Sequence, residues 1–560
     1  MRFSSLEIKN FRNFENIKIQ LDNRNVCFGL NDVGKSNLMY ALRMLLDKDV
    51  RKNNCVESDY YQHNISNPIE MVLGLDLSDE DNLDTEKLRA KIKGNMLSSE
   101  NILYIKLIAN YNETELSGNP ELFLGGDLNN LFPMNSKGIS YDIDAVFNVV
   151  YIDSYVDMYK LFAKNAKRLI SCTENDKTAL EKIDKSIKEL NENIAILSGV
   201  QNLETEISNR IKQYRSEKIE VQIKSEIAVK ELFSNIIPYL KAVDDDNLYP
   251  TAGDGSKKLI AYALFDIIAT NIKESKINLF FVEEPENHLH KSIQVALSKI
   301  LFNNDGYEYL FVTTHSSYIL HEMDDVNLIR LYKDCRNECF AHSVIYKLPT
   351  QYQDLKKVLN ERFTEALFVN KVLLVEGISE KLLFNRILQY LNPSYEAQGG
   401  FILVVDGIGF SIYYDFLTKL GIKVFVKTDN DLQYNPSKSK YNCLGLSRCN
   451  KMLGKELFST LTTDKDSVEE KRKIYNENID KLNEIRETHQ IFLSRCDLEN
   501  DLDEAIHTEL AQYTKMDHPV EYLQKSKKYN MACLVNSLSK EICAKIAKHY
   551  NFQCLKEFLA

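Results

Sequence analysis

Two short apolar runs in the last third of the chain end directly in acidic side chains. Residues 372–375 lead into Glu376, and a second run closes at residue 428, before Asp429 and Asp431. Uninterrupted apolar runs of this length are typical of strands that are buried on both faces of a parallel sheet. Open α/β sheets carry their functional groups at the carboxyl ends of such strands. The two runs therefore predict a parallel α/β sheet with carboxylates gathered at one edge.

The predicted group of carboxylates requires a cation. Like charges held close together cannot all stay ionised, and hard divalent ions prefer oxygen ligands. Gly377 directly follows Glu376 and has no side chain that would block a phosphate or a metal ion. Glu380 adds one more acid within a helical turn. We therefore predict a Mg²⁺ site for phosphodiester chemistry, with Mn²⁺ as an alternative ion.

Two later segments add to this predicted site. Residues 492–501 again end a strand-like run with acids, and residues 522–528 contain a basic cluster. In two-metal hydrolysis one ion activates water, the other stabilises the leaving oxygen, and a lysine can offset charge on the phosphate. The alternative interpretations are an acidic helix start and a solvated surface run. We assign as metal ligands Glu376, Asp429, Asp431 and Asp497, as a supporting ligand Glu380, as supporting acids Glu499 and Asp501, and as the phosphate-facing cation Lys527, with Lys525 beside it.

Length and charge limit the class of protein. A chain of 560 residues is too long for one core and suits two or three domains. The formal net charge of −11 argues against a generally basic nucleic-acid coat, although a basic channel can lie on an acidic protein. The N-terminus lacks the apolar core of a secretion signal, and no apolar run approaches a membrane span. We therefore expect a cytoplasmic protein.

A nucleotide site is predicted in the first half of the chain. Residues 29–36 form a Gly-x4-Gly-Lys-Ser pattern that follows a short apolar run and precedes a helical one. In this P-loop context backbone amides surround a phosphate, Lys35 contacts the outer phosphates, and the Ser36 hydroxyl ligates Mg²⁺. We therefore predict that ATP binds here with Mg²⁺, with Asn31 and Asn37 beside the phosphates.

Further polar groups suit the same nucleotide site. An apolar run ends in Glu283 and Glu284, which beside a P-loop would hold the metal ion and act as the base for water. His315 ends a third strand-like run, where it would contact a γ-phosphate. The glycine-rich segment 251–256 opens a helix and precedes two lysines, which predicts a second phosphate cradle. The alternatives are a buried strand with an acidic exit, a structural histidine and a flexible capped loop.

These motifs together resemble the ATPase half of the ABC, RecF and SMC group. In that group ATP binds between the P-loop of one subunit and the signature loop of another. The chain departs from the group at Glu283, where aspartate is usual, and in its signature, which is Thr-Ala-Gly-Asp-Gly-Ser. The resemblance therefore implies ATP binding more firmly than rapid hydrolysis. The predicted ATP-binding residues are Asn31, Gly34, Lys35, Ser36, Asn37, Gly253, Gly255, Ser256, Glu283, Glu284 and His315.

The acidic motifs resemble a second known fold. Glu376-Gly377 and Asp429-x-Asp431 after separate strands are similar to the Toprim fold of topoisomerases, DnaG-type primases and OLD-family nucleases. An ABC-type ATPase followed by a Toprim domain is the arrangement of OLD-family nucleases. Segments such as 8–14, 250–255 and 497–502 extend the resemblance to the Gabija group of anti-phage nucleases.

The resemblance implies a metal-dependent endonuclease that nicks or cleaves double-stranded DNA under nucleotide control. It also implies a homotetramer, arranged as a dimer of dimers, and a UvrD-like helicase, the second protein of the Gabija system, as partner. Other functions stay open: an ATP-gated DNA clamp or scaffold that does not cut, a topoisomerase, which would need a nucleophilic tyrosine domain, or a primase, which would need a template-binding module.

The expected organisation follows from changes in composition. Residues 176–235 are rich in Lys, Glu, Asn, Ile and Leu, with apolar residues at helical spacing. They predict a helical arm, either packed on its own domain or pairing with a second copy. We expect an α/β protein with an ABC-type ATPase domain at 1–365, an inserted helical dimerisation arm at about 155–240, and a Toprim domain at 366–560.

Overall fold

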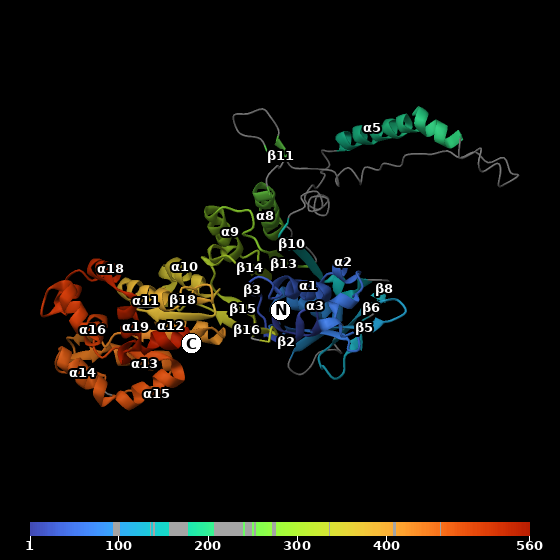
Figure 1. The fold of residues 1–560 in the computed structure, drawn as a ribbon. Helices are drawn as coiled ribbons and strands as arrows, with labels where there is room; N and C mark the ends of the chain where they lie inside the picture. Colours follow the sequence, from blue (N-terminus) through green and yellow to red (C-terminus); the bar gives the residue numbers. More distant parts are fainter. Residues whose placement is uncertain are drawn as a thin grey trace. The chain divides into compact units, whose positions relative to one another are not determined.

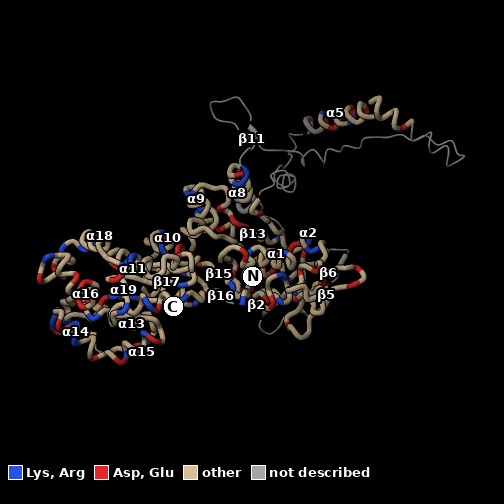
Figure 2. Tube along the Cα trace, viewed as in Figure 1, with Lys and Arg blue, Asp and Glu red and all other residues tan. Residues whose placement is uncertain are grey.

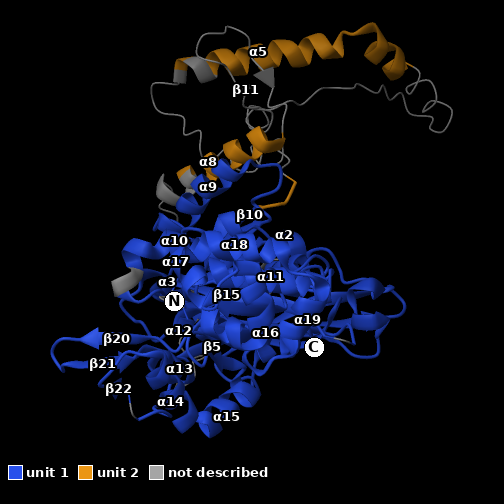
Figure 3. Ribbon diagram, turned by 60° about the vertical axis from the view of Figure 1, so that its left-hand side comes forward, with its two compact units in different colours: residues 1–151, 274–560 blue, residues 152–273 orange. Residues whose placement is uncertain are grey.

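The computed structural model of the chain (Figure 1) contains two compact units (Figure 3). Residues 1–151 and 274–560 form one unit, and residues 152–273 form the other. The second unit contains α5 (Lys177–Ala195), within the predicted arm, and α8 (Asp254–Asn271). Residues 156–176 and 206–238 of that arm lie outside the described residues. The structure describes residues 1–92, 101–134, 136–137, 140–155, 177–205, 239–240, 249–250, 254–271, 276–334, 336–406, 410–459 and 461–560.

A mostly parallel six-stranded sheet carries the P-loop. Its strand order is β10-β13-β14-β3-β15-β16, in which β13, β14, β3 and β15 run parallel and β16 is antiparallel. β14 is buried along its whole length, as its apolar run predicts. Neighbouring parallel strands bring their carboxyl ends to one edge. The strands are β3 (Arg24–Phe28), β10 (Phe147–Ile152), β13 (Ile277–Glu283), β14 (Leu310–Thr314), β15 (Val326–Lys333) and β16 (Cys339–Tyr346).

An antiparallel sheet in the order β2-β1-β4-β5-β6-β7 shares a core with α1 (Lys35–Leu46). Burial alternates along β5, so that Leu103, Ile105 and Leu107 enter the core. Leu42 on α1 packs in the same cluster. Full burial of each such aliphatic side chain contributes about 1.5–3 kcal/mol. The strands are β1 (Arg2–Phe11), β2 (Phe14–Gln20), β4 (Ile69–Asp76), β5 (Ile102–Asn112), β6 (Ser117–Gly125) and β7 (Phe132–Pro133).

A second parallel sheet forms the centre of the C-terminal part. Its order is β18-β17-β19-β23, and every neighbouring pair runs parallel. Leu373, Phe425 and Phe492 from three of its strands pack with surrounding helices in one core. The strands are β17 (Lys371–Val375), β18 (Gly400–Val404), β19 (Lys423–Thr428) and β23 (Ile491–Leu493).

The helices around the C-terminal sheet include two consecutive ones, α14 and α15, in the polar stretch near residues 464–487. Among the described residues, no helix combines the length and apolar content that a membrane crossing requires. The helices are α10 (Lys356–Ala366), α11 (Ile378–Leu391), α12 (Phe410–Lys419), α13 (Leu444–Leu453), α14 (Val468–Glu477), α15 (Ile479–His489), α16 (Leu498–Thr514), α17 (Pro519–Lys525), α18 (Lys527–Ser537), α19 (Lys540–Lys548) and α20 (Gln553–Leu559).

A small antiparallel sheet lies beside α13. β20 (Leu432–Asn435) and β21 (Lys440–Cys443) form a hairpin directly after Asp431, and β22 (Thr462–Thr463) pairs with β21. Along the described chain, Lys and Arg are interspersed with Asp and Glu (Figure 2).

Arg330 on β15 joins the ATPase sheet to the C-terminal part of the same unit. Its guanidinium donates to the carbonyl oxygens of Leu420, Gly421 and Val369 at 3.2, 2.8 and 3.2 Å, and to Asn370 Oδ1 at 3.2 Å. Burial lowers the pKa of Arg330 to about 10. The arginine still satisfies four acceptors at this boundary, so its loss would leave polar groups unpaired.

Candidate functional site

The P-loop connects β3 to α1 through a backbone that requires glycine. Gly34 has a φ of 104°, and a Cβ there would lie 2.3 Å from Asn13 Nδ2. Lys35 is buried and its Nζ donates to the carbonyl oxygens of Gly29 and Leu30, both at 3.1 Å. The loop is thus closed around its own lysine, in the strand-loop-helix context that the sequence predicted.

Two residues ahead of the P-loop support it from the antiparallel sheet. Asn13 Nδ2 donates to Val33 O at 2.9 Å, and Asn37 Nδ2 donates to Asn13 Oδ1 at 2.6 Å. Arg12 donates to Asn37 Oδ1 at 3.0 Å and to Asp59 Oδ1 at 2.9 Å. No local motif predicts this supporting role for the Phe-Arg-Asn-Phe segment, because the contact spans two separate elements.

One pocket of about 580 Å³ unites most of the predicted nucleotide residues. Glu284 has a φ of 41°, in the left-handed region, a strained position of the kind that clusters at functional sites. His315 Nδ1 lies 3.1 Å from Glu286 Oε1, which also accepts from the His315 amide at 2.6 Å. Glu286 therefore orients the histidine, a role that sequence reasoning missed. The pocket is lined by Asn13, Asn31, Asp32, Gly34, Lys35, Ser36, Asn37, Glu284 and His315.

The other predicted nucleotide residues are not among the described residues that line this pocket. Glu283 is buried at the end of β13 and does not line this pocket. Gly255 and Ser256 lie in the first turn of α8, in the second unit. Gly253 lies outside the described residues.

The predicted acids gather at one edge of the C-terminal sheet. Glu376 follows β17, Asp429 and Asp431 follow β19, and Asp497 follows β23, and these three strands are neighbours. Glu380 is buried in the first turn of α11, and a Cβ at residue 377 would lie 3.2 Å from its Oε2. The glycine thus gives the carboxylate room at the edge of the site.

Burial and mutual repulsion shift Glu376, Glu380 and Asp429 toward their protonated forms. Burial, with the charges of Glu380, Asp431, Glu376 and Asp497, raises the pKa of Asp429 well above its ordinary value. Burial also raises the pKa of Glu376, although Arg448 opposes the shift. For Glu380 the raised pKa comes first from burial and then from Glu376 and Glu499. Acids in this state gain most from a nearby cation.

Arg448 on α13 is a cation that the protein itself places among these acids. Its guanidinium contacts Glu376 Oε2 and Oε1 at 2.8 and 3.1 Å and Asp431 Oδ2 at 3.0 Å. It also donates to Thr428 Oγ1 at 2.9 Å. Sequence reasoning missed Arg448, because no local motif marks it.

In the acidic segment after β23, one acid caps a helix and another lies beside a lysine. Asp497 is the N-cap of α16 and accepts from the Asn500 amide at 2.9 Å, so the predicted site residue is also a helix start. Glu499 is buried, and its Oε2 lies 3.7 Å from Lys527 Nζ. The nearby acids, with Glu499 first, outweigh burial and raise the pKa of Lys527.

Two predicted supporting residues differ from the others in their surroundings. Asp501 is fully buried and pairs with Lys427 Nζ at 2.7 Å, inside the fold and away from solvent. Lys525 is exposed at the end of α17, and among the described residues no contact joins it to the acids. Ser494, which was not predicted, donates to Asp429 Oδ1 at 2.9 Å.

The carboxylates at this sheet edge suit a divalent cation, although they are not preorganised as a complete metal site. Among the described residues, no three His, Cys, Asp or Glu side chains meet as a metal-holding group. Arg448 holds oxygens of both Glu376 and Asp431. The raised pKa values and the all-oxygen donor set nevertheless fit a hard cation.

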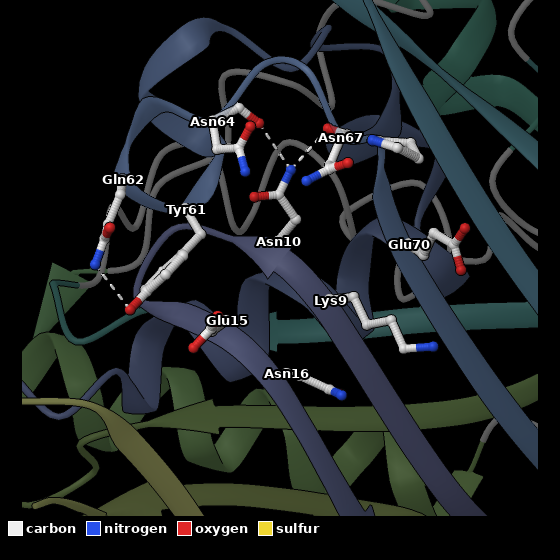
Figure 4. Close-up of a pocket in the computed structure, with 10 residues that line it drawn as sticks. Lys9, Asn10, Glu15, Asn16, Tyr61, Gln62, Asn64, Asn67 and Glu70 are labelled. Carbon is white, nitrogen blue, oxygen red and sulfur yellow. Dashed lines mark hydrogen bonds between the residues drawn. The ribbon is translucent and has the colours of Figure 1, made fainter.

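A separate pocket of about 480 Å³ lies against the antiparallel sheet (Figure 4). Asn10 Nδ2 spans its wall by donating to the carbonyl oxygens of Asn64 and Asn67 at 2.9 and 2.7 Å. Its lining mixes Lys9 with Glu15 and other polar side chains and contains none of the predicted site residues.

The fold and these sites define a P-loop ATPase joined in one chain to a Toprim sheet. The chain matches the family model of an AAA ATPase domain over residues 1–320. It matches that of the overcoming lysogenization defect protein-like TOPRIM domain over residues 367–431. The predicted α/β fold class, an ATPase domain followed by a Toprim domain, is thereby confirmed.

Two relatives extend this match along the chain. Endonuclease GajA of Bacillus cereus strain VD045 is 41% identical, over 100% of this chain and 99% of that protein. The Old nuclease of Escherichia phage P2 is 25% identical, over 81% of each protein. The chain therefore belongs to the OLD-family nucleases, in the group of Endonuclease GajA, as the sequence motifs indicated.

Proposed function

We propose that the chain is a metal-dependent DNA endonuclease of anti-phage defence, with cutting controlled by nucleotide at its ATPase part. The observation that supports this proposal best is that Glu376, Asp429 and Asp497 each follow one of three neighbouring parallel strands. Lys527 lies beside the same acids. The two relatives are by name an endonuclease and a nuclease, which supports the same activity.

The acids would hold the metal ions. Glu376, Asp429, Asp431 and Asp497, with Glu380 in support, provide oxygen ligands for Mg²⁺ or Mn²⁺. When bound, such ions activate water and stabilise the charge of the leaving oxygen. Lys527 is proposed to offset charge on the attacked phosphate, because it carries a cation into the acid group.

The P-loop pocket is proposed to bind ATP. Lys35, Ser36 and His315 would face the phosphates, and Glu284 would direct water. Gly253, Gly255 and Ser256 would contact the nucleotide of a second copy, which requires a homo-oligomer such as a dimer of dimers. A UvrD-like helicase, the second protein of the Gabija system, is the proposed partner. The domain boundary near residue 365 and the arm at about 155–240 stay part of this proposal.

Plasmid cleavage titrated with metal and ATP tests the proposal. We expect purified protein with Mg²⁺ or Mn²⁺ to cut double-stranded DNA, and Glu376→Ala or Asp429→Ala to abolish cutting while the protein stays folded. Full activity of either variant would exclude the assigned site. DNA binding without cutting by the wild-type protein would instead favour the clamp function.

A further inference from the structure

The hairpin of β20 and β21 presents basic and aromatic side chains without an acid among them. Residues 432–443 include two lysines, two tyrosines and no acid, although 81 of the 560 residues are acidic. Tyr434 is 53% exposed, and its ring lies 5.2 Å from that of its cross-strand partner Tyr441. Figure 3 shows β20 and β21 extending outward beside α13. An exposed aromatic pair next to lysines is typical of surfaces that bind nucleic-acid strands.

The lysines of this hairpin are available to an anion. Lys438 lies in the exposed turn, and no ion-pair partner accompanies it within the part of the chain that the structure describes. Lys440 Nζ lies 3.3 Å from Asp464, but both side chains are largely exposed. Exposed pairs of this kind contribute little, so the lysine can exchange the carboxylate for a phosphate.

Both ends of the hairpin are fixed to the acid group. β20 begins directly after Asp431, and the Leu444 amide beyond β21 donates to Asp431 O at 2.9 Å. A Cβ at Gly445 would lie 2.7 Å from Asp429 O, so α13 packs closely against the acidic turn. A strand bound to the hairpin would therefore lie at a defined place relative to the acids.

We propose that the hairpin 432–443 holds the DNA substrate next to the nuclease acids, with Lys438 and Lys440 on phosphates and Tyr434 stacked on a base. This inference rests on the proposed endonuclease function. Charge complementarity favours DNA over a protein partner. The hairpin carries positive charge beside acids that would otherwise repel the substrate.

Salt-dependent DNA binding in EDTA tests the lysines. We expect Lys438→Ala/Lys440→Ala to lower the slope of log affinity against log salt concentration by about two, since each phosphate contact contributes about 0.9. The matched control is Lys347→Ala/Lys419→Ala, which removes two exposed lysines elsewhere and leaves the slope unchanged. An unchanged slope in the hairpin variant would overturn the proposal.

Cleavage kinetics test the tyrosine. Tyr434→Ala is expected to raise KM for DNA on the order of tenfold with kcat nearly unchanged, whereas Tyr434→Phe keeps the ring and the wild-type KM. A Mg²⁺-induced rise in Tm in each variant shows that the acid site is folded. The hairpin proposal would be refuted if Tyr434→Ala left the KM of an active enzyme unchanged. It would also be refuted if the variant lost only helicase binding. Absence of cutting by the wild-type protein would instead refute the endonuclease function.

Discussion

The guanidinium of Arg448 forms a bidentate ion pair with Glu376, with nitrogen-oxygen distances of 2.8 and 3.1 Å. Its Nη2 also lies 3.0 Å from Asp431 Oδ2. A protein cation thus stands between two predicted metal ligands. Because an arginine cannot give up its charge at ordinary pH, a metal ion must share these oxygens with it or displace it.

Arg448→Ala should therefore bind Mn²⁺ more tightly and be less stable without metal. Removing the cation frees Glu376 and Asp431 for the metal but leaves their charges uncompensated, at a cost of about 1–3 kcal/mol. Calorimetric Mn²⁺ titration and urea unfolding in EDTA measure the two effects, with Arg448→Lys as the charge-preserving control. Weaker Mn²⁺ binding by Arg448→Ala would show that the arginine instead positions the ligands.

Asp429→Asn should stabilise the metal-free protein at pH 8. Burial and neighbouring acids raise the pKa of Asp429 well above its ordinary value. Its ionised form therefore destabilises the fold. This penalty is complete above the raised pKa and disappears as pH falls toward the unfolded value of about 3.9. The gain from asparagine, on the order of 1–3 kcal/mol, should shrink as pH falls from 8 to about 4.

Urea unfolding in EDTA across this pH range measures the gain from Asp429→Asn. Asp415→Asn, at an exposed acid paired with Lys419, is the matched control and should show no such pH-dependent gain. The Asp429→Asn variant should also lose stabilisation by Mg²⁺, since metal ligands must be ionised. If Asp429→Asn were less stable than wild type at pH 8, repulsion between the acids would not be what destabilises the ionised Asp429.

Replacing the two lysines of the basic cluster should affect the rate of DNA cleavage to very different extents. Both side chains are exposed, but Lys527 Nζ lies 3.7 Å from Glu499 Oε2, whereas among the described residues no contact joins Lys525 to the acids. We expect Lys527→Ala to lower kcat for DNA cleavage by about 10²–10³ and Lys525→Ala to leave it within a few-fold of wild type. Equal loss in both variants would point to a general electrostatic role for the cluster.

Lys35→Ala should abolish tight ATP binding without altering the metal site. Lys35 closes the P-loop through two carbonyl contacts and lines the nucleotide pocket. Fluorescent nucleotide titration measures the loss, with Lys48→Ala on the neighbouring short helix as control. The Mg²⁺-dependent rise in Tm should persist in Lys35→Ala. Its disappearance would mean that the two parts do not fold independently of the loop.

Arg330→Met should destabilise the first unit by about 2–4 kcal/mol. The change leaves three carbonyl oxygens and the Asn370 side chain without their donor at a buried boundary. Urea unfolding measures the loss, and Arg336→Met, at an exposed position, is the control. A neutral Arg330→Met variant would show that water replaces the arginine there.

Local patterns were enough to predict the strand ends that carry the sites. The runs before Glu376 and Asp429 form β17 and β19, and the P-loop lies between β3 and α1 as expected. Such features depend on residue spacing within a few positions, which periodicity and glycine placement reveal.

The sequence by itself thus determined that this chain carries a P-loop ATPase part and a Toprim part, each with its acids or glycines at strand ends. Only the tertiary structure decided which distant side chains meet them. It brought Arg448 to Glu376, Asn13 to the P-loop and Lys427 to Asp501. The physical reason is that such pairings depend on strand order and helix packing across many residues, and no spacing along the chain encodes them.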